Sequence, residues 1–217
     1  FIATGRSPAE TRDIMESANI HSGIFMNGQV VLYQGERVFS SEIPTETVER
    51  FHQMVKEDGY GLTAYNNKEF YLVESSAGAK DAYGFIHTNP PALNADFYKE
   101  NPINMMLFIS LPPAEDKYKV AFPNLDFLRN TPYSVDVISK GNSKAEGIKR
   151  FLEHLNQKDA ETYAFGDGPN DIEMLQAVTH PVAMGNALPV LKEIAEFITT
   201  NNTDNGIVNG LKHYGLI

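Results

Sequence analysis

The sequence predicts an α/β protein in which a Rossmann-like doubly wound core carries an inserted α+β domain. The first observation behind this prediction is that apolar strand-like runs alternate with helical patterns in residues 1–43 and 141–217. The second is that this alternation is lost in residues 44–140, where strand-like runs are separated by short helical or irregular pieces that contain prolines. The third is that short polar residues follow the apolar runs near both ends of the chain. We therefore expect one domain formed by residues 1–43 and 141–217, and a second domain formed by residues 44–140.

The N-terminal part is predicted to contain a strand, a helix and a β-hairpin region. Phe1–Thr4 is a short apolar run. Ser7, Pro8 and Glu10 have the spacing of a helix start, with Ser as the N-cap, Pro in the first helical position and Glu completing a capping box. After this helix, residues 23–41 are expected to form the hairpin region.

The middle part begins with a predicted helix after Pro44, because apolar residues recur there at helical spacing. Four strand-like runs follow, at residues 62–65, 70–73, 105–109 and 134–138. The acidic run Ala114–Asp116 is expected to be the solvated start of a helix.

The C-terminal part returns to alternating strands and helices. Ser143 and Glu146 have the spacing of a second capping box, which begins a helix with one apolar face. The elements expected after it are a strand at residues 162–165, a helix from Asp171, a strand at residues 180–184 and a helix at residues 187–197.

Composition and charge limit the classes of function. The chain has 217 residues, of which 42% are hydrophobic and 21% are charged, as in ordinary globular proteins. The formal net charge of −10 argues against nucleic acid or an anionic membrane surface as a partner. No apolar run approaches the ~18 residues of a membrane-spanning helix. Cysteine is absent, which excludes disulfides and thiolate metal sites, and a cytoplasmic location is expected.

The stretch Gly166–Asp171 is the strongest functional signal in the sequence. It places Asp167, Asn170 and Asp171 between a predicted strand and a predicted helix. In an open α/β sheet such a junction lies at the carboxyl edge of the strands, where ligands bind. Two close carboxylates favour a hard cation such as Mg²⁺, and the N-terminus of a helix offers N–H groups to an anion. We therefore expect a metal and a phosphate to bind here. The competing interpretation is a turn at Asp167 with Asn170 as the cap of the helix. Asn170 could serve as a cap and still bind phosphate.

Two other junctions carry candidate phosphate-binding groups. Lys144 occupies the first position of its predicted helix, where the helix dipole disfavours a cation by a few tenths to ~1 kcal/mol. This placement favours pairing with an anion, and the alternative is an ordinary solvated lysine. Thr4 and Gly5 offer a hydroxyl and a backbone N–H to a phosphoryl oxygen, although a Thr that ends a strand before a turn glycine is the commoner interpretation.

Taken together, these motifs resemble those of the haloacid dehalogenase (HAD) superfamily, specifically the Cof-type phosphatases with a cap of subclass IIB. The resemblance covers most of the chain. Residues 3–7 (Ala-Thr-Gly-Arg-Ser) are similar to motif II of that family, residues 141–144 to motif III and residues 166–171 to motif IV. Further similar segments are Met26-Asn27-Gly28, residues 183–187 and the tail at residues 200–207.

The resemblance implies Mg²⁺-dependent hydrolysis of small-molecule phosphate monoesters, of a sugar-phosphate type, through an aspartyl-phosphate intermediate. It implies that Thr4 and Lys144 are catalytic and that Asp167 and Asp171 bind the metal. Residues 44–140 would be the cap, which sets substrate specificity. The residues implied to bind phosphate or substrate are Gly5, Arg6, Asn27, Gly28, Asn170 and Asn186.

One motif of the family, Asp-x-Asp-x-Thr, is absent from the 217 residues. In the family this motif supplies the nucleophile and the general acid/base, and it precedes the position of Phe1. The resemblance therefore places the nucleophile upstream of Phe1, and the chain as given is expected to be inactive without it. Two alternatives to a phosphatase stay open, namely a non-catalytic relative that binds phosphorylated ligands and a phosphotransferase or mutase of the same superfamily.

Overall fold

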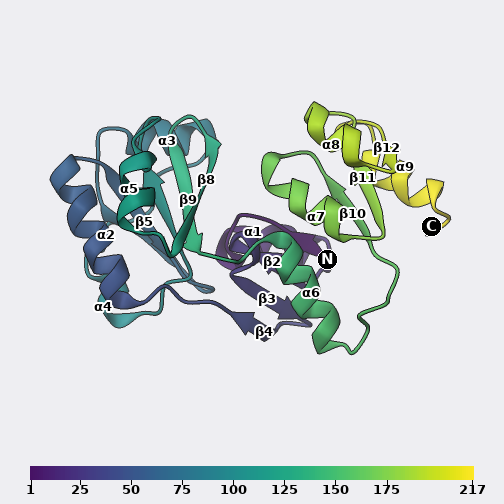
Figure 1. Cartoon of the computed structure of the whole chain (residues 1–217), viewed down its shortest axis with the longest axis horizontal. Helices are drawn as coiled ribbons and strands as arrows, with labels where there is room; N and C mark the ends of the chain where they lie inside the picture. The colour runs from purple at the N-terminus through teal and green to yellow at the C-terminus, as the bar shows by residue number, and fades with distance from the viewer. The chain divides into compact units, whose positions relative to one another are not determined.

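The computed structural model describes residues 1–217 and divides into two compact units, residues 1–142 and residues 143–217 (Figure 1). Both units mix helices with sheets, so the α/β class predicted from the sequence is confirmed. The domain division predicted from the sequence, with residues 1–43 and 141–217 apart from residues 44–140, stays a prediction. None of the helices combines the length and the apolar composition needed to cross a membrane.

The first sheet of the N-terminal unit has four strands in the order β1-β2-β3-β4. The strands are β1 (Ile2–Ala3), β2 (Gly23–Phe25), β3 (Val30–Tyr33) and β4 (Glu36–Ser40). β1 pairs with β2 in parallel, and the other two pairs are antiparallel. Helix α1 (Pro8–Ser17) connects β1 to β2, and its predicted capping box is confirmed, because Ser7 and Glu10 exchange hydrogen bonds.

The second sheet of this unit is antiparallel, with five strands in the order β6-β5-β7-β9-β8. Its strands are β5 (Gly61–Tyr65), β6 (Phe70–Glu74), β7 (Met105–Ile109), β8 (Leu125–Thr131) and β9 (Ser134–Ser139). The four predicted strands are present, but β8 was not predicted. β8 carries Asp126, Arg129 and Asn130, which break the apolar pattern, and such residues are tolerated because β8 is an edge strand that pairs only with β9.

Two helices pack on one face of the five-stranded sheet, α2 (Thr45–Asp58) and α5 (Glu115–Ala121) (Figure 1). Phe51 of α2 is fully buried, and its ring lies 5.7 Å from that of Phe108 and 5.1 Å from that of Tyr118. Helices α3 (Ala79–Phe85) and α4 (Phe97–Glu100) lie in the connection between β6 and β7. The opposite face contributes Tyr65, Met105 and Ile138 to an apolar cluster that also contains residues of the β2–β3 segment.

The expectation that the acidic run at residues 114–116 is solvated is wrong for Glu115. This residue is 7% exposed, and its carboxylate accepts hydrogen bonds from Arg129 Nε at 2.7 Å and Arg129 Nη2 at 2.6 Å. The guanidinium of Arg129 lowers the pKa of Glu115 below its ordinary value of 4.5. The sequence could not reveal this pair, because Arg129 lies in the unpredicted strand β8.

The Glu115–Arg129 pair predicts a loss of stability in acid. The pKa of Glu115 is lower in the folded than in the unfolded protein, so the ionised side chain stabilises the fold at pH values above its unfolded pKa. This stabilisation is lost as the pH falls through the folded pKa. Glu115→Gln is expected to lower the free energy of unfolding by about 1.5–3 kcal/mol near neutral pH. In urea titrations this difference should shrink as the pH is taken from about 7 to about 3.5. The exposed Glu193→Gln serves as control, and a difference that stays constant over this range would contradict the assignment.

The C-terminal unit contains a parallel sheet of three strands in the order β10-β11-β12. The strands are β10 (Tyr163–Gly166), β11 (His180–Ala183) and β12 (Phe197–Ile198). The helices of this unit are α6 (Lys144–His154), α7 (Ile172–Ala177), α8 (Pro189–Ile194) and α9 (Gly206–His213). The helix predicted at residues 187–197 is therefore shorter than expected, and its last predicted residue belongs to β12.

Two predicted helix starts of this unit need correction. The Ser143 hydroxyl accepts a hydrogen bond from the N–H of Glu146 at 3.3 Å, but the Glu146 side chain does not return the bond and lies 3.7 Å from Lys149 Nζ instead. The helix expected from Asp171 is preceded by a 3-10 turn at Pro169–Asp171 and begins at Ile172. No side chain caps α7, so the interpretation of Asn170 as its cap is wrong.

Candidate active site

The turn after β10 is organised around the carboxylate of Asp171. Its Oδ2 accepts hydrogen bonds from the backbone N–H groups of Asp167 at 2.9 Å and Gly168 at 3.0 Å. A Cβ atom added at Gly166 would lie 2.6 Å from the Cβ of Asp171, so this close turn requires glycine at the last position of the strand. The sequence Gly-Asp-Gly-Pro-Asn-Asp thus folds into a turn that is closed by its own last carboxylate.

The other carboxylate oxygen of Asp171 binds Lys144. Lys144 Nζ lies 2.6 Å from Asp171 Oδ1, and the two side chains are only 6% and 8% exposed. The lysine is in the first turn of α6, where the helix dipole disfavours it, so the paired carboxylate compensates for both the dipole and the burial. The anion paired with Lys144 in the structure is thus a carboxylate of the protein itself, 27 residues along the chain, and the binding of a docked anion stays a prediction.

Asp167 differs from Asp171 in that it is exposed. Its Oδ2 accepts a hydrogen bond from Asn186 Nδ2 at 2.8 Å, and Asn186 Oδ1 in turn accepts one from the N–H of Asn202 at 3.0 Å. Asn186 comes from the segment after β11 and Asn202 from the segment after β12. The segments that follow β10, β11 and β12 thus meet at Asp167, as expected for the carboxyl edge of a parallel sheet.

The two carboxylates fit a magnesium ion to different degrees. Mg²⁺ takes oxygen ligands and commonly binds through one or two carboxylates while it keeps several waters. The exposed carboxylate of Asp167 suits such a ligand, whereas both oxygens of Asp171 already accept hydrogen bonds. No group of three or more His, Cys, Asp or Glu residues in residues 1–217 is arranged to hold a metal. Of the two carboxylates, that of Asp167 is the one with an oxygen open to an added ligand, whereas Asp171 is used within the turn.

A second group of predicted residues lies in the N-terminal unit, in the turn after β1. Thr4 Oγ1 accepts a hydrogen bond from the N–H of Arg6 at 3.1 Å, and the Thr4 carbonyl accepts one from the N–H of Asn27 at 3.1 Å. The N–H of Gly5 donates no hydrogen bond within the protein. The Arg6 side chain is exposed. This turn therefore presents a free backbone donor beside a hydroxyl, which is the pair of groups expected to bind a phosphoryl oxygen.

Within the region predicted as a hairpin, Asn27 and Gly28 form a 3-10 turn between β2 and β3 together with Met26. Asn27 has φ 53° and Gly28 has φ 92°, conformations that asparagine and glycine tolerate better than other residues. Asn27 is 1% exposed, and its amide lies against Gly5, where an added Cβ would be 3.3 Å from both amide heavy atoms. The two predicted phosphate-binding turns of this unit are therefore in contact.

Sequence reasoning missed one residue of this group, Asp136. Its Oδ2 accepts hydrogen bonds from Asn27 Nδ2 and from Asn130 Nδ2, each at 3.0 Å. The signal in the sequence is a carboxylate in the middle of β9, between the buried residues Val135 and Val137. Because alternate residues of a strand point to opposite faces, Asp136 lies on the other face from those two valines.

The predicted site residues thus fall into two groups, one in each unit. The group of residues 143–217 contains Lys144, Asp167, Asp171 and Asn186, joined by hydrogen bonds, together with the half-buried Asn170. The group of residues 1–142 contains Thr4, Gly5, Arg6, Asn27 and Gly28, with Asp136 added by the structure.

Comparison with known proteins identifies the family of the chain. The sequence profile of the haloacid dehalogenase-like hydrolases matches residues 1–211. YkrA of Bacillus subtilis (strain 168), described as a candidate phosphatase, is 36% identical over 218 residues, a match that covers 100% of this chain and 84% of YkrA. A candidate phosphatase of Streptococcus pyogenes serotype M6 is 30% identical over 237 residues, covering 99% of this chain and 85% of the relative. The chain therefore belongs to the haloacid dehalogenase-like hydrolases.

Solved structures show the same fold over the whole chain. A protein from Geobacillus kaustophilus HTA426 matches with a TM-score of 0.92 at 31% identity, covering 99% of this chain and 84% of that chain. The subclass IIB sugar phosphatase BT4131 matches with a TM-score of 0.85 at 28% identity, covering 100% of this chain and 85% of that chain. The predicted fold, an HAD core with an inserted α+β cap, is confirmed by these matches.

Proposed function

We propose that this chain is the greater part of a Mg²⁺-dependent phosphatase that hydrolyses small-molecule phosphate monoesters of a sugar-phosphate type. The observation that carries the proposal is the network in which Asp171 binds Lys144 and two backbone N–H groups while the neighbouring Asp167 stays exposed. The Asp167 carboxylate accepts a hydrogen bond from Asn186 and stays open to solvent, so it can take a further ligand. The names of the relatives, which are phosphatases or candidate phosphatases, support the reaction class.

In the proposed mechanism the residues of this chain bind and position the phosphoryl group. The Thr4 hydroxyl and the Gly5 N–H donate hydrogen bonds to phosphoryl oxygens, with Arg6, Asn27, Gly28, Asn170 and Asn186 as further phosphate- or substrate-binding residues. Lys144 contributes positive charge toward the phosphoryl oxygens, where it stabilises the charge of the transition state. Asp136 holds the amide of Asn27 in place.

Asp167 is proposed to be the ligand of Mg²⁺, and Asp171 is proposed to support that ligand through the turn. When bound, the ion would neutralise negative charge on the phosphoryl oxygens. The attacking group is proposed to be an aspartate upstream of Phe1, whose carboxylate oxygen attacks phosphorus as the ester bond to the leaving group breaks. Water then releases phosphate from the aspartyl phosphate. Residues 44–140 are proposed to be the cap that selects the substrate, on a core of residues 1–43 and 141–217.

Product analysis tests this proposal against its two alternatives. The natural full-length protein would be incubated with Mg²⁺ and a series of sugar phosphates, nucleotides and cofactor phosphates. We expect inorganic phosphate and the dephosphorylated compound in equal amounts for at least one ester. A phosphorylated second product would instead indicate a phosphotransferase or mutase, and ligand binding without turnover would indicate a non-catalytic relative.

A further inference from the structure

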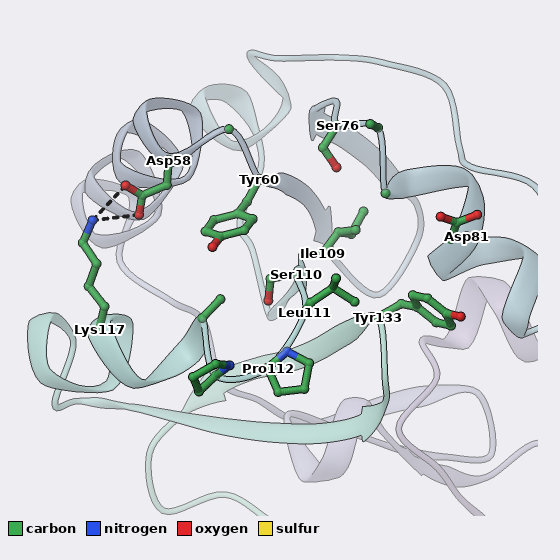
Figure 2. A pocket seen from close by; sticks show the side chains of 15 residues that line it. Asp58, Tyr60, Ser76, Asp81, Ile109, Ser110, Leu111, Pro112, Lys117 and Tyr133 are labelled. Carbon is green, nitrogen blue, oxygen red and sulfur yellow. Dashed lines mark hydrogen bonds and ion pairs between the residues drawn. The ribbon is translucent and has the colours of Figure 1, made fainter.

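A pocket of about 750 Å³ opens at one end of the five-stranded sheet (Figure 2). Three neighbouring strands end there in register, because Gly61 at the start of β5 is paired with Ile109 at the end of β7, which is paired with Ser134 at the start of β9. The loop after β6, at residues 76–78, and the loop after β7, at residues 110–114, line the pocket. This volume is within the ~300–1,000 Å³ range of sites for small organic ligands.

The pocket is distant from the candidate phosphate-binding turns of its own unit. Tyr65, Met105 and Ile138 form the opposite ends of the same three strands, and they share an apolar cluster with Met26. Met26 begins the turn that contains Asn27. Because a strand rises about 3.3 Å per residue, the five residues of β5 separate the two ends by more than about 10 Å.

Aromatic and apolar side chains form the walls. Figure 2 shows Tyr60 and Tyr133 with Ile109, Leu111 and Pro112 around the same space. Tyr60 packs edge-on against Phe108, with ring centroids 5.4 Å apart, and Tyr133 lies 5.7 Å from Phe85. Rings fixed in this way favour a flat, apolar ligand, since they lose little conformational freedom when it binds.

One wall carries a polar atom that lacks a partner. The hydroxyl oxygen of Ser76 is buried and makes no hydrogen bond, and in Figure 2 it points toward the interior of the pocket. A Cβ atom added at Gly61 would lie 2.7 Å from this oxygen, so the position of the hydroxyl depends on glycine there. Although it points inward, this oxygen is covered and has almost no accessible surface, so it offers no hydrogen bond to a ligand held in the pocket.

The charge of the residues that line the pocket favours some flat ligands over others. Asp58 accepts hydrogen bonds from Lys117 Nζ at 2.8 Å on each of its oxygens, so these two lining residues neutralise one another. Asp81 also lines the pocket, is exposed, and has no ion-pair partner. The lining is therefore net negative, which favours a cation and disfavours a phosphorylated compound.

We propose that this pocket is a second ligand-binding site, for a planar aromatic or heterocyclic amine whose ring lies between Tyr60 and Tyr133 and whose ammonium group faces Asp81. It is separate from the phosphate-binding residues, and its occupation does not require phosphatase activity.

Tryptamine and indole-3-propionate test the proposal, because they share a flat ring but carry opposite charges. Saturation-transfer NMR and calorimetric titration would be carried out on the full-length protein. Tryptamine is expected to bind, with intermolecular NOEs to the methyl groups of Ile109 and Leu111, and indole-3-propionate to bind at least about threefold more weakly. No binding of tryptamine, equal binding of both probes, or NOEs to other methyl groups would overturn the proposal.

One variant tests the contact with Asp81. Asp81→Asn is expected to weaken tryptamine binding about threefold, as for an exposed ion pair, while its effect on indole-3-propionate should be absent or opposite. Asp116→Asn is the matched control, because Asp116 is an exposed aspartate of the same unit that does not line the pocket. The fold of Asp81→Asn would be verified by circular dichroism, and an unchanged affinity for tryptamine would then overturn the assignment of the ammonium group. The NOEs of the unaltered protein test the site without any variant.

Discussion

Asp167→Asn is expected to reduce Mg²⁺-dependent phosphate release from an aryl phosphate by at least about 10³-fold, because a bound metal supplies several kcal/mol of transition-state stabilisation. The substitution removes the negative charge and keeps the shape of the side chain. The fold should tolerate it, since Asp167 is exposed and an asparagine oxygen can still accept the hydrogen bond from Asn186. The measurement is the steady-state rate of a protein that includes the proposed upstream nucleophile.

The affinity of the protein for Mg²⁺ provides a second test of this prediction. Calorimetric titration with Mg²⁺ should show weaker binding to Asp167→Asn than to the unaltered protein. Asp159→Asn is the control, because it removes the same charge from an exposed position of the same unit, and it should leave both the rate and the Mg²⁺ affinity unchanged. Asp167→Asn activity at the level of the unaltered protein would refute the metal-binding role.

Lys144→Met is expected to have two effects of different origin. Removing the ammonium group leaves the carboxylate of Asp171 buried without its cation, which should lower the free energy of unfolding by about 3–5 kcal/mol. It should also lower kcat by about 10²-fold or more, if the lysine stabilises charge in the transition state. Urea unfolding measures the first effect, and the rate per folded molecule measures the second.

The double variant Lys144→Met/Asp171→Asn separates the two effects. Replacing both members of a buried ion pair commonly restores stability, because neither charge is left unpaired. We therefore expect the double variant to unfold at a higher urea concentration than Lys144→Met while kcat stays low. A double variant that regains both stability and kcat would show that Lys144 serves the structure alone.

The sequence predicts residues of the C-terminal candidate site, and their roles stay predictions. Asp167 and Asp171 stand out because two carboxylates lie at one strand-to-helix junction, and Lys144 stands out because the N-terminus of a helix disfavours a cation. Their mutual arrangement could not be predicted, since the pairing of Lys144 with Asp171 depends on how α6 packs beside the turn after β10. For the same reason the sequence suggested an anion docked beside Lys144 and did not reveal that the carboxylate of Asp171 pairs with it.

The residues that the sequence missed act through long-range contacts. Asp136 is hydrogen-bonded to Asn27, which lies 109 positions away in the chain, and no local sequence pattern indicates this contact. The sequence predicts that Glu115 is a solvated residue of an acidic run, whereas in the structure it pairs with Arg129 of β8. The strand β8 itself escaped prediction because a strand at the edge of a sheet needs less apolar alternation than one inside it.

The dependence of phosphate release on Mg²⁺ tests the central claim most directly. The initial rate of the natural full-length protein would be measured with a sugar phosphate over a range of Mg²⁺ concentrations and in excess EDTA. We expect a rate that saturates with Mg²⁺, falls to background in EDTA and returns when Mg²⁺ is added again. An undiminished rate in EDTA would contradict the claim that Asp167 holds a metal required for hydrolysis.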